Sequence, residues 1–370
     1  SADNMFLLFV VFQIIWLSSQ MSRTGVMKDL VTAIRSRLSR RASIAVLPAI
    51  VGMLPMPGGA IFSAPLVQDC DSENELDPLL KTKINYWFRH VWEYWWPLYP
   101  GVLLAIDLSG LQVWQFVLIQ LPMTLVAVAV GYFFLLRKIP EGEGGSGAFE
   151  HHGVHEILQL VAPVLAVIVI YVVVRVFLPF VTGWNKYLPM ILGIFGAIAV
   201  HQWQRPLGRS IWREILCSKK TLNLAVIVAV VRIYGSFIEA RLPSGELLVE
   251  VMRNELAGWH VPVVSVMMLI PFISGLSTGL AIGFVGASFP IVISLLGENP
   301  ALSELVPTVV LAFGFGYMGM ILSPVHICLI VTNEHFRTRL LHSIARLARP
   351  AAAVLVGVVG YYLLIRLLLG

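Results

Sequence analysis

Long apolar runs, each close to the length of a bilayer-spanning helix, dominate this sequence and most constrain how it can fold. Such a helix needs about 20 mainly apolar residues. Six uninterrupted runs meet this requirement, at residues 4–21, 111–136, 154–178, 184–203, 221–241 and 350–369. Hydrophobic residues make up 58% of the chain and charged residues 13%, the latter about half the share of soluble proteins. The sequence therefore predicts an all-α polytopic membrane protein and excludes a cytosolic enzyme, a secreted disulfide scaffold and a nucleic-acid binder.

Other apolar regions are interrupted by proline, glycine and serine. They lie at residues 43–68, 261–294 and 302–332, and a further broken segment surrounds Pro97 and Pro100. Proline and glycine remove helix continuity. At membrane depth, freed backbone groups are tolerated only inside protein or beside a water-filled cavity. These breaks therefore indicate where a functional site lies.

The interruptions occur twice in the same order, which predicts an internal duplication. Each broken stretch follows a spanning helix and an amphipathic segment, 26–38 or 246–257, and precedes a second broken helix. We predict a first repeat at 1–139, a linker at 140–153 and a second repeat at 154–370. The first repeat has no counterpart of 154–203, so two N-terminal helices are expected to be missing from it. The aligned pairs are Pro48 with Pro271, Ile50 with Ile273, Gly52 with Gly275, Ser63 with Ser288, and Pro65 with Pro290.

The distribution of basic residues predicts opposite orientations for the two repeats. If 43–68 and 261–294 are re-entrant hairpins, while 85–108 and 302–332 cross, then 20 of the 26 lysines and arginines share one side. This count includes Arg89, taken as the start of its helix. The positive-inside rule makes that side cytoplasmic, and one hairpin then enters from each side. The predicted cytoplasmic segments are 22–42, 68–84, 137–153, 204–220 and 333–349.

Inverted repeats with broken helices that meet at mid-membrane are typical of secondary transporters. Helix ends there present amides to anions and carbonyl groups to cations. For any single small residue, the alternative explanation is close helix packing. The predicted substrate and ion site consists of Pro57, Gly58, Gly59 and Ser63 from the first hairpin, Ser274, Ser277, Thr278, Gly279 and Ser288 from the second, and Tyr99, Pro100, Gly101, Ser323, Pro324 and His326 from the broken helices.

Ionisable residues within apolar runs allow several interpretations. Arg232 and Glu239 lie seven residues apart on nearly one helical face, where they either bind an anion or form a structural ion pair. His326 follows a Ser-Pro break and is a proton-coupling group, a neutral ligand or a packed histidine. Asp107 is predicted to lie at the interface. The cluster His151, His152, His155 and Glu156 adjoins a glycine-rich loop and is predicted to be solvated rather than metal-binding.

An aromatic run from Tyr86 to Trp96 has Arg89, His90 and Glu93 interleaved. We interpret it as a membrane-interface belt rather than a platform for nucleic acid. The sequence carries no nucleotide-binding glycine loop or metalloprotease motif. We therefore expect a non-enzymatic protein with no resident cofactor or metal, coupled instead to Na⁺ or H⁺.

Three strings carry a family resemblance: LPMPGGAIFSAPLV, INYWFRHVWEYWWPLYPGVLLA and SPVHICLIVTNEHF. They resemble the bacterial and archaeal integral-membrane family called domain of unknown function 401, which is grouped with gluconate permeases and citrate and dicarboxylate transporters in the ion transporter superfamily. The resemblance implies a homodimer in a prokaryotic inner membrane, in which a transport domain moves like an elevator against a fixed scaffold. It also implies a small organic anion as substrate, with sodium or proton coupling. The dicarboxylate branch has Ser-Asn-Thr at its hairpin tips, whereas this chain has Pro-Met-Pro-Gly-Gly and Ser-Thr-Gly. The substrate and the coupling ion of that branch therefore do not carry over.

These observations together predict a cation-coupled secondary transporter of a small, carboxylate-bearing organic anion. The hairpin tips and broken helices would hold substrate and ion, and segments 26–38 and 246–257 would act as interfacial levers. Two alternatives remain open. One is an anion channel on the same fold, and the other is a membrane-embedded enzyme or lipid-handling protein.

Overall fold

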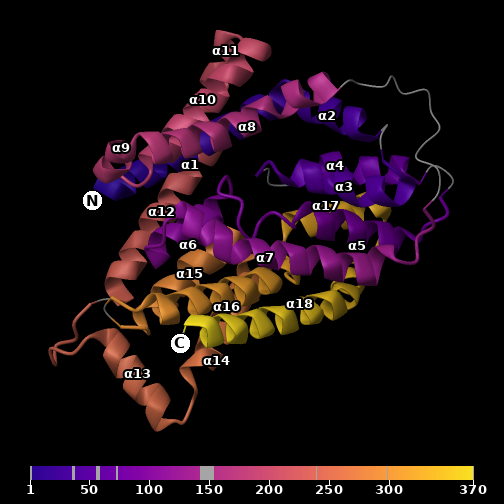
Figure 1. The fold of residues 1–370 in the computed structure, drawn as a ribbon. Coiled ribbons are helices and arrows are strands. Elements are labelled where there is room, and N and C mark those ends of the chain that lie inside the picture. The colour runs from indigo at the N-terminus through magenta and orange to yellow at the C-terminus, as the bar shows by residue number, and fades with distance from the viewer. Residues whose placement is uncertain are drawn as a thin grey trace. The chain divides into compact units, whose positions relative to one another are not determined.

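The computed structural model of this chain describes residues 2–35, 38–55, 59–71, 74–141, 154–238, 240–297 and 299–369. Across these ranges the chain is helical, without a β-strand, and carries one isolated bridge between Arg241 and Leu247 (Figure 1). The helices form two compact units. The first comprises Ser1–Met56 and Pro140–Val228, and the second comprises Pro57–Ile139 and Ala229–Gly370.

The first unit combines helices from both sides of the predicted linker. Helix α10 packs against α1 and α8. Within this layer the Gln13 side-chain amide donates to the carbonyl of Ile191 at 3.3 Å, and Thr24 Oγ1 lies 2.8 Å from His201 Nε2. Its helices are α1 (Ala2–Arg23), α2 (Val26–Arg35), α3 (Arg40–Gly52), α8 (Val154–Phe177), α9 (Pro179–Trp184), α10 (Leu188–Gln204), α11 (Arg209–Leu216) and the first half of α12 (Lys219–Ile238).

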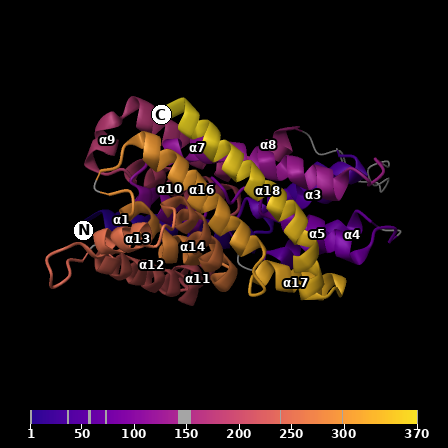
Figure 2. The same cartoon turned by 90° about the horizontal axis from the view of Figure 1, so that it is seen from below.

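The second unit is built around α16, whose side chains are nearly all buried. Helices α14 and α18 pack on its two sides, and the two views show the three lying next to one another (Figure 2). The helices of this unit are α4 (Ala60–Asp69), α5 (Pro78–Arg89), α6 (Pro100–Ser109), α7 (Val113–Gly131) with its π-helical extension η1 (Tyr132–Leu136), α13 (Leu248–Gly258), α14 (Val263–Thr278), α15 (Ala281–Ser294), α16 (Leu302–Ile321), α17 (Ile327–Phe336) and α18 (Leu340–Leu369).

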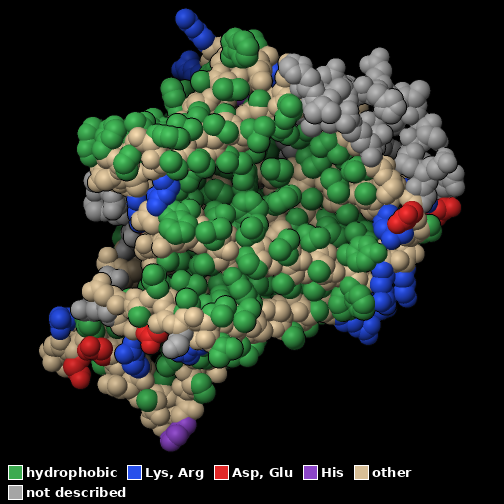
Figure 3. Space-filling model, in the orientation of Figure 1, with side chains coloured by type: hydrophobic (Ala, Val, Ile, Leu, Met, Phe, Trp, Pro, Cys, Tyr) green, Lys and Arg blue, Asp and Glu red, His purple; other side chains and the backbone are tan. Residues whose placement is uncertain are grey.

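Several of these helices are long and apolar enough to cross a membrane, so the chain is a multi-pass membrane protein. In the described part of the chain there are five such spans, or six if the bent pair α13–α14 counts as one. Apolar side chains cover most of the surface seen in Figure 3. The five spans are Met5–Arg23, Val113–Leu136, Leu158–Phe177, Leu302–Ile321 and Leu340–Leu369.

The breaks in the apolar regions fall at loops and at turns formed by glycine. Most of the prolines do not mark a break. Gly279 and Leu280 join α14 to α15, and Gly279 has a left-handed backbone with φ of +61°. Pro48, Pro271 and Pro290 instead lie inside helices. Pro350 likewise lies inside a helix: α18 begins at Leu340 and not near residue 350 as predicted. Proline is tolerated there because neighbouring helices can satisfy the freed backbone groups.

Helices α14 and α16 approach so closely that their backbones touch. A Cβ on Gly275 would collide with the carbonyl of Gly316 and lie 2.7 Å from the backbone nitrogen of Met320. A Cβ on Gly319 would in turn collide with the carbonyl of Phe272. Small residues at such contacts allow membrane helices to pack closely. The closeness of α14 to α16 thus depends on these glycines.

We expect Gly275→Ala to destabilise the second unit by about 1–3 kcal/mol, because the added methyl group overpacks a backbone contact. Thermal unfolding of the detergent-purified chain would measure this change. Gly360→Ala is the matched control, since Gly360 lies in α18 with open space around it. In a helix interior the control should be neutral or stabilising, by about 0.5–1 kcal/mol. Equal melting temperatures for the two variants would contradict the assigned packing.

Candidate functional site

Helices α5 and α17 run antiparallel in the second unit, and the chain breaks at their ends meet. Near one end the hydroxyl groups of Thr82 and Thr338 lie 3.0 Å apart, and one turn further Asn85 donates to Thr332 at 3.1 Å. Because α5 continues to Arg89 while α17 begins at Ile327, the C-terminus of α5 meets the N-terminus of α17. The break after α5 therefore faces the break before α17.

Buried aromatic side chains anchor these breaks by hydrogen bonds to backbone carbonyl groups. The Tyr86 hydroxyl donates to the carbonyl of Ile321 at 2.9 Å, and the Tyr317 hydroxyl donates to the carbonyl of His90 at 2.5 Å. Trp87 donates through its ring nitrogen to the carbonyl of Ala127 at 2.9 Å. Buried aromatic donors with such partners are structural. The predicted membrane-interface belt is therefore wrong for this part of the run, because Tyr86, Trp87, Tyr94 and Trp96 are all buried within the protein.

Three ionisable residues lie buried at the end of α5. The exposed fractions are 1% for Arg89, 2% for His90 and 6% for Glu93. Arg89 is in the last turn of α5, so the prediction that it begins its helix is wrong. Glu93 Oε1 lies 3.9 Å from His90 Nε2, and the Glu93 carboxylate also accepts a hydrogen bond from the Tyr99 hydroxyl. Ionisable groups within a membrane span are costly and usually functional.

Helix N-termini surround this buried group. A Cβ on Gly59, the N-cap of α4, would collide with the Arg89 guanidinium. A Cβ on Gly279 would lie 2.9 Å from the backbone nitrogen of His326, the N-cap of α17. One on Gly101, in the first turn of α6, would lie 2.6 Å from Cβ of Ala281, which begins α15. Since an N-terminus carries roughly half a positive charge, these helix ends favour negative charge, and the carbonyl ends of α5 and α14 lie beside them.

Six of the residues predicted from the sequence lie along this chain of contacts. Ser323 is buried and donates from its hydroxyl to the carbonyl of Leu276 at 2.6 Å, which ties the α17 break to the end of α14. Pro100 opens α6 beside them and is half-buried. The six residues are Gly59, Tyr99, Gly101, Gly279, Ser323 and His326.

Other predicted residues lie nearby but satisfy their polar groups locally or face outward. The hydroxyls of Thr278 and Ser288 donate within their own helices, to the carbonyls of Ser274 and Phe284, each at 2.7 Å. Ser277 and Pro324 are exposed.

Ser63 is fully buried in α4. Within the described part of the chain its hydroxyl has no hydrogen-bond partner. Gly101 and Gly279 need their lack of a side chain to fit, whereas Ser63 retains an unused hydrogen-bonding group.

Some predictions fall on residues that the structure does not describe. Pro57, Gly58 and Glu239 lie outside the described ranges, as do His151 and His152 of the loop cluster. The backbone of Arg232 belongs to α12 and that of His155 and Glu156 to α8, but their side chains are also outside the description. Asp107, predicted at the interface, is largely buried near the end of α6, with an exposed fraction of 9%.

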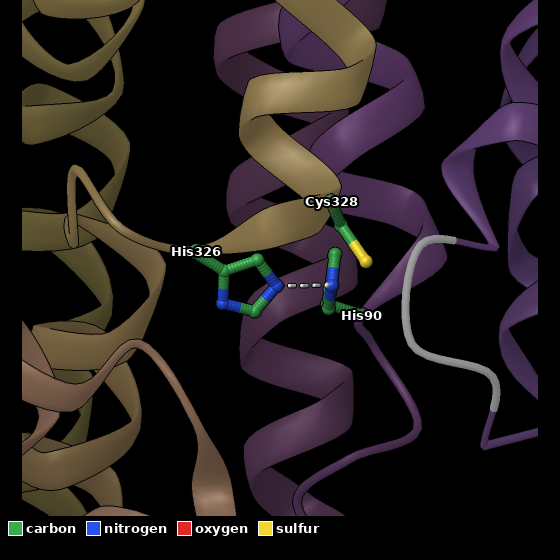
Figure 4. A group of neighbouring side chains, drawn as sticks. All are labelled: His90, His326 and Cys328. Carbon is green, nitrogen blue, oxygen red and sulfur yellow. Dashed lines mark hydrogen bonds between the residues drawn. The ribbon is translucent and has the colours of Figure 1, made fainter.

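A group of potential metal ligands occupies the junction of α5 and α17 (Figure 4). His90 Nε2 and His326 Nε2 are 3.1 Å apart, and Cys328 Sγ and the two histidine ligand atoms all lie within 4.8 Å of one another. All three side chains are buried. Of this group, only His326 is a site residue predicted from the sequence. The sequence signal that could have revealed His90 was its place beside Arg89 and Glu93 in segment 85–108, which was expected to cross the membrane.

A family model described as a protein of unknown function, DUF401, matches residues 1–365, so this chain belongs to that family. No curated protein matches the sequence.

Proposed function

We propose that this member of the DUF401 family is a cation-coupled secondary transporter of a small, carboxylate-bearing organic anion, as in the ion transporter superfamily. The observation that carries the proposal is the buried arginine at a junction of helix N-termini. Arg89 is 1% exposed and contacts the N-cap of α4 at Gly59. A guanidinium can bind a carboxylate with two parallel hydrogen bonds.

The surrounding helix termini strengthen this preference for an anion. Helices α4, α6, α15 and α17 begin at or beside the site, and their amide ends favour negative charge without the cost of further buried cations. The Glu93 carboxylate interacts electrostatically with the Arg89 guanidinium. A substrate carboxylate that took over this interaction from Glu93 would retain the charge balance of the buried site.

The division of the chain into two units supports an elevator-like movement. Each unit takes helices from before and after the predicted linker at 140–153. This interleaving is expected if two inverted repeats contribute jointly to a scaffold and to a mobile transport unit. In the proposal the second unit carries the substrate, with 43–68 and 261–294 as re-entrant hairpins. Helices α2 and α13 lie at the membrane–water interface. Two chains form a homodimer in a prokaryotic inner membrane.

Substrate entry requires a rearrangement of the site. The cavity that borders His90 has a volume of about 10 Å³, comparable to one water molecule and much smaller than an organic anion. The Gly279 tip packs against the backbone at His326, so separation of this tip from α17 is the simplest way to open the site. The proposed transport cycle thus has an occluded state held together by a glycine contact.

Two cations remain compatible with the proposal. His90 and His326 are groups that can exchange a proton, whereas carbonyl groups at the C-termini of α5 and α14 suit Na⁺. A thermal-shift screen of small carboxylates against the detergent-purified chain, with pH and Na⁺ varied independently, identifies both partners at once. We expect a carboxylate to raise the melting temperature, and one cation to increase that effect. Stabilisation by no organic anion under any condition would contradict the proposal.

The second candidate function is an anion channel, favoured by the same buried arginine and helix N-termini. A transporter with alternating access exchanges labelled for unlabelled substrate, so proteoliposomes loaded with the identified anion should accumulate labelled anion transiently against its gradient. A channel produces no such counterflow. Absence of counterflow together with electrical conductance would favour the channel.

A further inference from the structure

We infer that His90, His326 and Cys328 form a binding site for a divalent transition-metal ion of the zinc type. Two imidazole nitrogens and one thiolate sulfur are ligands that zinc prefers, whereas Na⁺, Mg²⁺ and Ca²⁺ prefer oxygen. The three side chains are at most 6% exposed. The inference replaces the expectation from sequence that the protein holds no metal.

The orientation of His90 is that of a metal ligand. Its Nδ1 lies 2.5 Å from the carbonyl of Tyr86, which can only accept a hydrogen bond, so Nδ1 carries the proton. In the neutral ring Nε2 therefore has a lone pair, and this atom faces His326, with Cys328 beside the ring (Figure 4). Metal-binding histidines commonly donate their other N–H to a carbonyl or carboxylate, which fixes the tautomer and the ring orientation.

The spacing of the ligand atoms suits a small ion. With metal–nitrogen distances of about 2.0–2.1 Å, two nitrogen ligands of a tetrahedral zinc are roughly 3.3 Å apart. The two Nε2 atoms here are 3.1 Å apart. Cys328 Sγ lies within 4.8 Å of both nitrogen ligand atoms. Zinc would therefore require only small side-chain movements.

The elements that present the ligands hold them in place. His90 follows α5 directly, and the hydrogen bond from Tyr317 to its carbonyl anchors its backbone. His326 is the N-cap of α17, and its ring packs against Tyr86 with ring centroids 5.4 Å apart. Cys328 lies in the first turn of α17, where the helix N-terminus favours a thiolate. The site is therefore preorganised by contacts that exist without the metal.

A fourth ligand position is available beside the three. Glu93 Oε1 is 3.9 Å from His90 Nε2, close enough to complete the tetrahedral set after a side-chain rotation. Three protein ligands plus one exchangeable position are typical of zinc sites that bind a substrate. If the proposed function holds, a substrate carboxylate would take this position in place of Glu93, and this role rests on that function. Metal binding itself does not.

The competing explanation is a hydrogen-bonded cluster without a metal, in which His326 Nε2 donates to His90 Nε2 and the Cys328 side chain also hydrogen-bonds to His90. Titration of the chelator-treated full chain with Co²⁺ separates the two explanations, because a cysteine-bound Co²⁺ has a thiolate-to-metal charge-transfer band and intense visible bands when tetrahedral. Elemental analysis after loading with Zn²⁺ then gives the stoichiometry.

We expect about one zinc ion per chain and a charge-transfer band that Cys328→Ser removes. Cys70→Ser and Cys217→Ser are matched controls, because neither cysteine belongs to the group of potential metal ligands, and both should retain the band. His326→Gln should lower the affinity for Co²⁺ by at least about tenfold. An unchanged band in Cys328→Ser, or zinc below about a tenth of an ion per folded chain, would overturn the inference.

These experiments can contradict the metal site and the proposed transport function independently of each other. The spectra are recorded without an organic anion, so they remain informative if no substrate is found. Conversely, carboxylate-dependent stabilisation that is equal in zinc-loaded and chelator-treated protein would retain the proposed function while excluding the metal as the anchor of the carboxylate.

Discussion

Replacing Arg89 with glutamine is expected to weaken binding of the proposed organic anion by about 30-fold or more and to abolish its uptake. Truncating one member of a buried charge pair costs about 2–5 kcal/mol, and each 1.4 kcal/mol corresponds to about a tenfold change in affinity. Arg89 is 1% exposed, so water cannot replace the guanidinium as a partner for the carboxylate. Isothermal titration of the purified variant with the identified anion, followed by uptake in proteoliposomes, measures both effects.

Two further variants separate lost recognition from misfolding. Arg89→Lys retains the charge but loses the two parallel donors, so binding should be partly restored. Arg349→Gln is the matched control, because Arg349 is an exposed arginine on α18 of the same unit. It should bind and transport like the unmodified protein. Normal anion binding by folded Arg89→Gln protein would disprove the assigned site.

Replacing Gly279 with alanine is expected to stop uptake while leaving a protein that can still be purified. The left-handed backbone at this position costs alanine about 1–2 kcal/mol. In addition, the new Cβ would lie 2.9 Å from the backbone nitrogen of His326 and 3.0 Å from Ser323 Oγ. This contact closes the proposed occluded state, so the collision should impair closure more than it impairs folding. Uptake in proteoliposomes and thermal unfolding measure the two effects.

Gly110→Ala is a closely matched control for this prediction. Gly110 ends α6 with φ of +70°, as Gly279 ends α14 with φ of +61°, but no atom lies within 4 Å of its prospective Cβ. Both variants should therefore lose a similar amount of stability from backbone strain. Only Gly279→Ala should lose uptake. Equal loss of uptake in the two variants would assign the effect to strain and would contradict the role of the tip contact.

The sequence predicted the helical elements of this protein well where hydrophobicity alone determines them. The predicted apolar runs correspond to α1, α7, α8, α10, α12 and α18, and the amphipathic segments to α2 and α13. The breaks near Pro100 and Pro324 also occur as predicted. Prolines were a weaker guide, because Pro271 and Pro290 lie inside helices and the turn between them forms at Gly279. The inverted arrangement of the two repeats stays a prediction.

The candidate site was only partly predictable. Small residues at breaks identified Gly59, Gly101 and Gly279, because close approach of helix ends requires them there. Arg89 and His90 were missed, since a run rich in Trp and Tyr also has the composition of an interfacial belt. An interfacial belt and a buried site differ in whether the side chains face the lipid or the protein interior, and composition carries no information on that orientation.

Hydrophobic runs, taken by themselves, determined that this chain is a multi-pass helical membrane protein, and their interruptions predicted a site at the helix breaks. Local composition suffices for this, because the bilayer imposes the length and polarity of each span. Only the tertiary structure decided which polar groups meet. Arg89 and His90 are more than 230 positions from His326 and Cys328 in the chain, and the antiparallel packing of α5 against α17 brings them together. Such contacts depend on how the helices pack, and neither spacing nor hydropathy specifies that.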